Sequence, residues 1–360
     1  MKEIKNKNLK NNNSDKKNNR KTENSNNIEI SQGNNEYKGK QELYVRQKPI
    51  ELDRLVEIAK AQSTEASNEI EGIVTTRPRF KQLMNDKITP KNRSEQEIIG
   101  YRNTLNIIHE SYNYIPIKPN NILQLHRELL RQTELSYGGK FKNTPNEIDA
   151  IDSNGNKTVL FKPLDPFETP DAIERLCETF NREMALENVE PLILICNFIL
   201  DFLCIHPFND GNGRMSRLLT LLLLYQSGFI VGKYISIEKA IADNKELYYE
   251  VLQKSDENWH EETNDPTHFI KYMLGIILGC YRDFEERITI VEKAGTKSTS
   301  YDIVKKYVEN TVGKFTKNDA LIACPSLGSS SVESALKKLV EDNTISRKGS
   351  GKNTFYVRNN

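Results

Sequence analysis

The feature that most restricts the fold of this chain is the apolar segment 191–205, in which Asn197 and Asp201 are the only strongly polar residues. A helix that is apolar on nearly all sides has to be buried. We therefore expect 191–205 to be a central helix around which the rest of the chain packs. A second apolar run, 218–225, follows shortly afterwards. Neither run reaches the ~18–20 residues that cross a bilayer, so we expect no membrane segment.

Most of the chain around these runs has the spacing of amphipathic helices. Apolar residues recur every three or four positions in the segments 52–59, 98–108, 122–130 and 171–184. One interval differs, because 146–151 and 157–162 are strand-like runs joined by turn residues at 152–156. This pattern predicts a β-hairpin, which would lean on the helical body since two strands alone are marginally stable. The fold class predicted is mainly α.

The pattern changes again after residue 295. Three short helices are expected at 301–310, 317–323 and 330–341. Two strands follow at 344–347 and 354–358, and the loop between them is basic. Three helices followed by a two-stranded wing are typical of a small winged-helix (α+β) domain, which we place at 296–360.

The N-terminal residues differ from both parts. Residues 1–27 carry eight basic and three acidic residues, a net of +5, and almost no apolar ones. Such a segment cannot offset the entropy lost on ordering. We therefore predict a disordered Asn/Lys-rich tail over 1–41. A helical region over 42–135 and a catalytic core over 136–290 would follow.

Charge and cysteine usage bear on compartment and partners. The whole chain has 51 basic and 50 acidic residues, a net of +1, whereas 297–360 alone has eleven basic and six acidic, a net of +5. The five cysteines are odd in number and lack CxxC spacing, and no apolar leader begins the chain. We expect a protein of the reducing cytoplasm, without disulfides or a zinc site.

The segment 206–217, between the two apolar runs, combines the groups that a phosphate site needs. Gly211-Asn212-Gly213 opens the second helix, whose first N–H groups lack intrahelical partners and lie at the positive end of the helix dipole. A helix start of this kind binds anions such as phosphates. Arg214 and Arg217 are three residues apart on one helix face, where their guanidinium groups can bind further phosphate oxygens.

Two more residues of this segment supply chemistry. Asp210 is a hard oxygen ligand placed to hold Mg²⁺ against bound phosphates. His206 is the titratable group suited to proton transfer near neutral pH. Together these groups indicate attack by a hydroxyl on a nucleotide phosphate. Any one of them alone would indicate only a capped helix start with a surface histidine.

The run from His206 to Arg217 resembles the Fic family signature, His-Pro-Phe-x-Asp/Glu-Gly-Asn-Gly-Arg-x-x-Arg, at every specified position. Members mostly transfer AMP from ATP to a hydroxyl side chain of a target protein. The resemblance covers roughly 42–290 and implies a helical core, with His206 as the base and Asp210 as the Mg²⁺ ligand. The Gly-Asn-Gly form, which the phosphorylating Doc branch has lost, favours AMP transfer.

The resemblance also assigns binding roles. It implies that Gly211, Asn212 and Gly213 line the phosphate pocket and that Arg214 and Arg217 contact the β- and γ-phosphates. The hairpin 146–162 would be the flap on which a target segment docks by strand addition. Before it, Gly139-Lys140-Phe141-Lys142 replaces the usual Gly-x-Tyr-Arg, which leaves the start of the flap open. Tyr248 and Tyr249 resemble the helix that covers the adenine, although adjacent tyrosines are also common in simple packing.

An upstream segment, Ser67-Asn68-Glu69-Ile70-Glu71-Gly72, matches the inhibitory motif of the family, Ser/Thr-x-x-x-Glu-Gly/Asn. Ser67 and Glu71 are four residues apart on one helix face, and Gly72 suits a helix C-terminus. A carboxylate on this helix can form a bidentate pair with an arginine of the phosphate site. By resemblance the partner is Arg217, and the pair would keep the γ-phosphate from its productive pose.

Several alternatives stay open at this point. The inhibitory glutamate positions water in some relatives, so the enzyme can instead remove AMP, and UMP, phosphate or phosphocholine can be the transferred group. The winged helix can bind DNA, with 329–338 as recognition helix and Arg347, Lys348 and Lys352 on phosphates. The leading face of that helix lacks Arg, Asn and Gln, which favours a protein-interaction module. A homodimer is compatible with the sequence.

Overall fold

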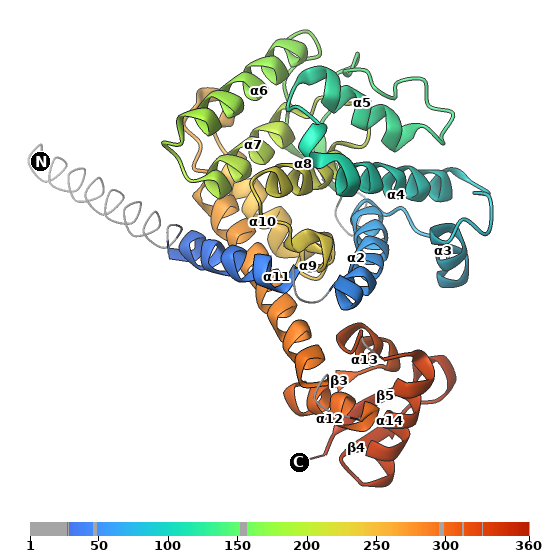
Figure 1. Cartoon of the computed structure of the whole chain (residues 1–360). Coiled ribbons are helices and arrows are strands. Elements are labelled where there is room, and N and C mark those ends of the chain that lie inside the picture. The colour runs from blue at the N-terminus through green and yellow to red at the C-terminus, as the bar shows by residue number, and fades with distance from the viewer. Residues whose placement is uncertain are drawn as a thin grey trace, which may run out of the picture.

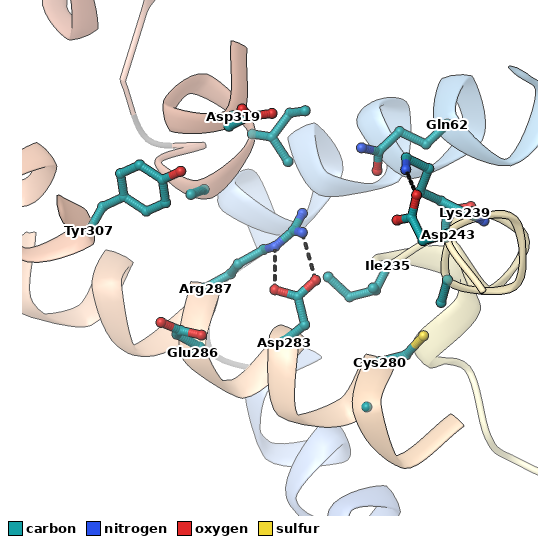
Figure 2. Close-up of a pocket in the computed structure, with 15 residues that line it drawn as sticks. Gln62, Ile235, Lys239, Asp243, Cys280, Asp283, Glu286, Arg287, Tyr307 and Asp319 are labelled. Carbon is teal, nitrogen blue, oxygen red and sulfur yellow. Dashed lines mark hydrogen bonds and ion pairs between the residues drawn. The ribbon is translucent and has the colours of Figure 1, made fainter. Parts of the chain in front are cut away.

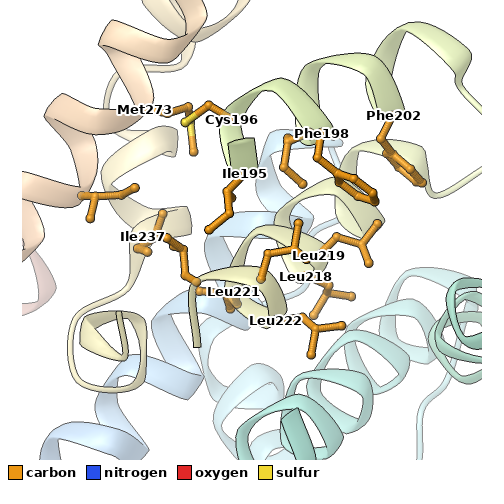
Figure 3. Packing of buried hydrophobic residues seen from close by; sticks show 14 of the residues in the cluster. Ile195, Cys196, Phe198, Phe202, Leu218, Leu219, Leu221, Leu222, Ile237 and Met273 are labelled. Carbon is orange, nitrogen blue, oxygen red and sulfur yellow. The ribbon is translucent and has the colours of Figure 1, made fainter. Parts of the chain in front are cut away.

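The computed structural model of this chain describes residues 27, 29–45, 49–151, 157–294, 299–311, 313–325 and 327–359 (Figure 1). Helix α7 (Pro191–Ile205) lies in the interior and packs against α8 (Asn212–Gln226). Ile195 and Phe198 of α7 and Leu218, Leu219 and Leu222 of α8 belong to one buried cluster (Figure 3). The two apolar runs of the sequence thus form the centre of the fold, as expected.

The other helices of the body surround this pair. They are α2 (Pro49–Ile70), α3 (Arg77–Met84), α4 (Arg93–Ser111), α5 (Pro119–Leu130), α6 (Thr169–Leu186), α9 (Ile237–Ala242), α10 (Lys245–Asp256) and α11 (Thr267–Ala294). One hydrophobic cluster runs from Leu52 to Ile288. The regions predicted as 42–135 and 136–290 therefore share a single core. No helix in the described ranges has the length and apolarity to span a bilayer.

The predicted hairpin is present. Strands β1 (Ile148–Ile151) and β2 (Lys157–Phe161) pair antiparallel, with an irregularity between Ile148 and Asp149. Phe161 is buried, and its ring lies against those of Trp259 and His260, so the hairpin does lean on the helical body. The predicted turn 152–156 lies outside the described residues.

The C-terminal part has its own core, with Val304, Phe315 and Leu336 among its buried residues. Its elements are α12 (Ser300–Asn310), β3 (Lys314–Phe315), α13 (Lys317–Ala323), α14 (Ser329–Glu341), β4 (Ile345–Lys348) and β5 (Phe355–Arg358). The sheet order is β3-β5-β4, all antiparallel. Three helices followed by two strands were predicted after residue 295, and α12, α13, α14, β4 and β5 are present in that order. The two-residue strand β3 was not predicted, because a strand that short has no alternation to detect.

A cavity of about 430 Å³ lies between this domain and the helices α2, α9 and α11, and residues of both parts line it (Figure 2). Arg287 projects into it from α11 and donates through Nε and Nη2 to Asp283, at 3.0 and 2.6 Å. Tyr307 and Asp319 line it from the C-terminal domain. None of the residues 206–217 is among its lining residues, so this hollow is separate from the site predicted by the motif.

The prediction of a disordered tail over 1–41 is wrong for residues 29–41, which belong to a helix at 29–45. Ser31, Asn34 and Gln41 are buried on one face of this helix. Asn34 donates to the carbonyl of Leu274 at 3.2 Å, and Gln41 accepts from the Tyr281 hydroxyl at 3.0 Å. The most buried positions of this face are polar, and its apolar residues Ile30, Tyr37 and Tyr44 are seven residues apart, so a search for apolar residues every three or four positions misses it. The predicted tail over 1–26 lies outside the described residues.

The crossing of α4 and α5 yields a test of packing. A Cβ built on Gly100 of α4 collides with the backbone carbonyl of Leu129 on α5. We therefore expect Gly100→Ala to lower the free energy of unfolding by about 1–3 kcal/mol through overpacking. Gly275→Ala is the matched control in α11, because its Cβ would meet open space. It should raise stability by about 0.5–1 kcal/mol. Urea unfolding of both variants decides this, and equal effects would refute the close crossing.

Candidate active site

The start of α8 is shaped by two residues of the glycine turn. Gly211 has φ 87°, a left-handed conformation that glycine adopts without strain, and its N-cap position carries no side-chain hydrogen bond. The Asn212 side chain accepts from the N–H of Phe208 at 2.9 Å and donates to the Phe208 carbonyl at 2.8 Å. Asn212 therefore closes the loop with its side chain. Any contact it makes with phosphate would come from its backbone N–H.

His206 ends α7 and stands at the edge of this loop. Its backbone is left-handed, with φ 52° and ψ 62°. Nδ1 lies 3.2 Å from the carbonyl of Leu203 and donates to it, which leaves Nε2 without the proton and able to accept one. Burial lowers the pKa of the imidazole to about 4, outweighing the Leu203 hydrogen bond and the charge of Glu71, which raise it. The ring is therefore neutral at pH 7 and can act as a base.

Two residues that the sequence analysis did not assign hold the loop from beneath. His126 is fully buried, stacks on Phe208 at 3.7 Å and accepts from the N–H of Gly139 at 3.1 Å. Its Nε2 then donates to the carbonyl of Asp210 at 3.0 Å. Lys142, at the position where the family usually has arginine, donates through Nζ to the carbonyl of Ile205 at 3.0 Å. A lone histidine or lysine carries no local signal for such a role, since its partners are distant in sequence.

The C-terminus of α2 contacts the phosphate site directly. The N–H groups of Gly72 and Ile73 bond to the carbonyls of Glu69 and Asn68 at 2.9 Å, and Gly72 has φ 74°. This is a Schellman ending, and it agrees with the predicted role of Gly72. It leaves Glu71 as the C-cap residue directly after the helix, from which the side chain reaches α8.

The ion pair expected between Glu71 and Arg217 is present. Nη2 of Arg217 lies 2.7 Å from Oε1 of Glu71 and 2.9 Å from the carbonyl of Ser67. Nε of Arg217 donates to the hydroxyl of Ser67 at 2.7 Å. The arginine therefore contacts one oxygen of Glu71 instead of both, because two of its bonds go to Ser67.

The carboxylate of Glu71 also lies close to the start of α8. A Cβ built on Gly213 would collide with Oε1 of Glu71 and lie 3.1 Å from its Cδ. The carboxylate thus lies against the Gly213 backbone, where the helix dipole favours negative charge. A phosphate and this carboxylate cannot both occupy that place.

Asp210 lies on the other side of the loop, in contact with two arginines. Oδ2 is 2.6 Å from Nη2 of Arg93, and Oδ1 is 3.3 Å from Nη2 of Arg214. Arg214, only 1% exposed, also pairs through Nη1 with Oε2 of Glu97 at 2.5 Å. Arg214 is thus turned to the interior, and its predicted contact with phosphate would require another side-chain position. Arg93 and Glu97 carried no recognisable signal in the sequence.

The donor set suits Mg²⁺ only together with a nucleotide. No group of three or more His, Cys, Asp or Glu side chains among the described residues can hold a metal by itself. Mg²⁺ is commonly bound by one or two carboxylates and the substrate phosphates. The partly exposed carboxylate of Asp210, next to the anion site of α8, fits this pattern. When bound, the ion would neutralise developing charge on the phosphates.

The two predicted adenine-site tyrosines have different surroundings. Tyr248 is 4% exposed and packs on Phe269 and Tyr272, as a core residue does. Tyr249 is 43% exposed. Of the two rings, only that of Tyr249 is therefore accessible for stacking with an adenine.

Comparisons with known proteins identify the family. A sequence profile of the Fic/DOC family matches residues 116–224. A Fido domain-containing protein of Dictyostelium discoideum is 32% identical over 122 residues, which are 33% of this chain and 80% of that protein. The protein adenylyltransferase fic-1 of Caenorhabditis elegans is 26% identical over 140 residues, which are 38% of this chain and only 25% of that protein.

Solved structures agree in fold. A Fic family protein of Desulfovibrio desulfuricans superposes with a TM-score of 0.61 at 20% identity, covering 93% of this chain and 96% of that one. Fic-1 of C. elegans, residues 134–508, gives 0.58 at 18% identity, covering 75% and 74%. The chain belongs to the Fic/DOC family.

The buried histidine beneath the loop yields a prediction for pH. Burial lowers the pKa of His126 to about 4 from an ordinary 6.5. The unfolded chain therefore binds this proton first, and stability should fall as pH drops from about 6.5 toward 4, by about 2 kcal/mol for this group. His126→Gln keeps a donor and an acceptor but cannot titrate. In this variant the urea concentration at the unfolding midpoint should therefore decrease less as pH falls.

The exposed His268→Gln is the control for that measurement, and it should leave the slope as in the unmodified chain. Parallel slopes for His126→Gln and the unmodified chain would contradict the assignment of this stability change to His126.

Proposed function

We propose that this chain is a protein adenylyltransferase that transfers AMP from ATP to a Ser, Thr or Tyr hydroxyl of a target protein and releases pyrophosphate. The observation that carries the proposal is that His206 and Asp210 lie on the loop leading into the helix start at Gly211–Gly213, where Arg217 pairs with a carboxylate that lies against Gly213. Relatives named protein adenylyltransferases support it. This chain matches only 25% and 31% of the length of these two relatives, so its substrates and partners are also part of the proposal.

In the proposed reaction the target hydroxyl oxygen attacks the α-phosphorus of ATP. The new P–O bond forms as the α–β anhydride bond breaks, and pyrophosphate leaves. Nε2 of His206 accepts the hydroxyl proton, while its Nδ1 stays bound to Leu203. The α8 N–H groups and Arg217 stabilise the phosphates. Tyr249 would stack on the adenine.

We further propose that the end of α2 holds the enzyme inhibited. Glu71 neutralises Arg217 and fills the position against Gly213 that a phosphate needs. Transfer therefore requires Glu71 to leave. We also propose that the protein transfers AMP to a hydroxyl group of its own chain, and this self-modification gives a simple assay.

The first test compares Glu71→Gly and His206→Ala. Glu71→Gly should raise incorporation of label from [α-³²P]ATP into protein by about tenfold or more, since ~1.4 kcal/mol of lost competition gives tenfold. His206→Ala in the Glu71→Gly background should lower it by about 10²–10⁴-fold. The mass added to the protein identifies AMP and distinguishes it from phosphate.

Glu69→Gly serves as the matched control, because this exposed residue is on the same helix. It should leave labelling unchanged. Unchanged labelling by Glu71→Gly would contradict the inhibition, and label that is independent of His206 would contradict the reaction. Faster loss of AMP from a labelled protein would instead favour the hydrolase.

The hairpin is the proposed docking site for an extended target segment. Val159 and Leu160 on β2 are 49% and 40% exposed, although they are apolar. The segment before β1 is bound to the catalytic loop, since Asn146 donates to the carbonyl of Phe208 at 3.0 Å. A target strand added to the hairpin would therefore lie at a fixed distance from His206.

A second candidate function is binding of duplex DNA by the C-terminal domain. Arg347 and Lys348 on β4 are exposed, as are Lys337 and Lys338 on α14, which suits phosphate contacts. Lys352 of the predicted wing has no described side chain. The start of α14 offers Ser330 and Glu333, which do not favour base reading.

Fluorescence anisotropy with a generic duplex tests this function. Binding should weaken as salt rises and be lost in the double variant Arg347→Glu/Lys348→Glu. Absence of binding at low salt would leave protein interaction as the role of the domain.

A further inference from the structure

Four charged side chains form a closed ring beside the catalytic loop. Arg93 pairs through Nε with Oε1 of Glu97 at 2.6 Å and through Nη2 with Oδ2 of Asp210 at 2.6 Å. Arg214 pairs with the second oxygen of each acid, at 2.5 Å to Glu97 and 3.3 Å to Asp210. Two cations and two anions alternate, so the ring is neutral.

We propose that Arg93 competes with a divalent cation for Oδ2 of Asp210, and so restrains the site in addition to Glu71. This inference rests on the proposed function, because Asp210 is the expected Mg²⁺ ligand. A guanidinium group bound to a carboxylate oxygen satisfies the same negative charge that a divalent cation needs. The loading of Asp210 therefore requires Arg93 to release Oδ2.

Arg93 is the member of the ring that can move. Its side chain is 57% exposed, and it stands at the first residue of α4, where the chain enters from a loop. Arg214 and Glu97, by contrast, have side chains only 1% and 4% exposed. If Arg93 turns away from Asp210, it can keep its bond to Glu97 four residues later on the same helix. The ring then opens at one contact without leaving a buried charge unpaired.

The arginine restraint and the glutamate restraint act on different groups. Glu71 contacts Arg217 and the Gly213 backbone, at the phosphate position. Arg93 contacts Asp210, at the metal position. Removing Glu71 therefore leaves the Arg93–Asp210 pair in place, and the two effects can be measured separately.

Arg93→Gln is the decisive variant, because it removes the charge but keeps a polar side chain. Mn²⁺, which accepts the same ligands as Mg²⁺, is titrated into the full chain with the Glu71→Gly change and α,β-methylene-ATP, whose α–β bridge cannot be cleaved. Electron paramagnetic resonance of free Mn²⁺ gives the Kd. We expect Arg93→Gln to tighten binding by about three- to tenfold, since the competing and repelling cation is gone.

Three further variants define the outcome. Arg93→Lys keeps the charge and should stay close to the parent. Arg131→Gln removes an exposed arginine that pairs with Glu128, and should leave the Kd unchanged. In an Asp210→Asn background the effect of Arg93→Gln should vanish.

Unchanged, weaker or absent Mn²⁺ binding in Arg93→Gln, or an effect that persists without Asp210, would overturn the proposal. Failure of AMP transfer appears instead in the labelling assay, which does not measure metal affinity, so the two failures are distinguishable.

Discussion

The apolar contact between α7 and α8 is the constraint from which the site follows. Both helices are buried along most of their length, so their relative position is set by the core. The segment 206–211 must then reverse the chain within a short span. The Asn212–Phe208 clasp and the stacked ring of His126 fix this reversal. The orientation of the α8 N-terminus is therefore a result of packing, achieved before any ligand arrives.

The charged groups of the site are paired with one another within the chain. Arg217 is paired with Glu71, and Arg93 and Arg214 share Glu97 and Asp210. Buried cations left alone would be costly, and each acid reduces that cost. In the proposed reaction, a nucleoside triphosphate that enters would have to replace these internal anions with its own. The same ion pairs that stabilise the protein would therefore weaken the proposed binding of ATP.

The sequence allowed the central helices, the hairpin and the 206–217 site to be predicted, because each depends on residues close together in the chain. The contact between Glu71 and Arg217 was also predictable, since Ser67 and Glu71 have helical spacing and Gly72 follows the end of the helix. Residues that act through distant partners were not. His126, Lys142 and Arg93 meet the loop only after α4, α5 and α7 have packed. The helix at 29–45 was missed because polar residues take its most buried positions and its apolar residues are widely spaced.

The left-handed backbone of His206 has a consequence for the proposed base. A non-glycine residue at φ 52° carries strain of about 1–2 kcal/mol, which the surrounding packing must hold in place. The chain stops being helical at that residue, so the imidazole is carried by a fixed corner of the main chain. The position of the imidazole therefore depends mainly on the backbone, which the core holds in place, and less on rotation of the side chain. A loosened core would displace the base before it unfolded the protein.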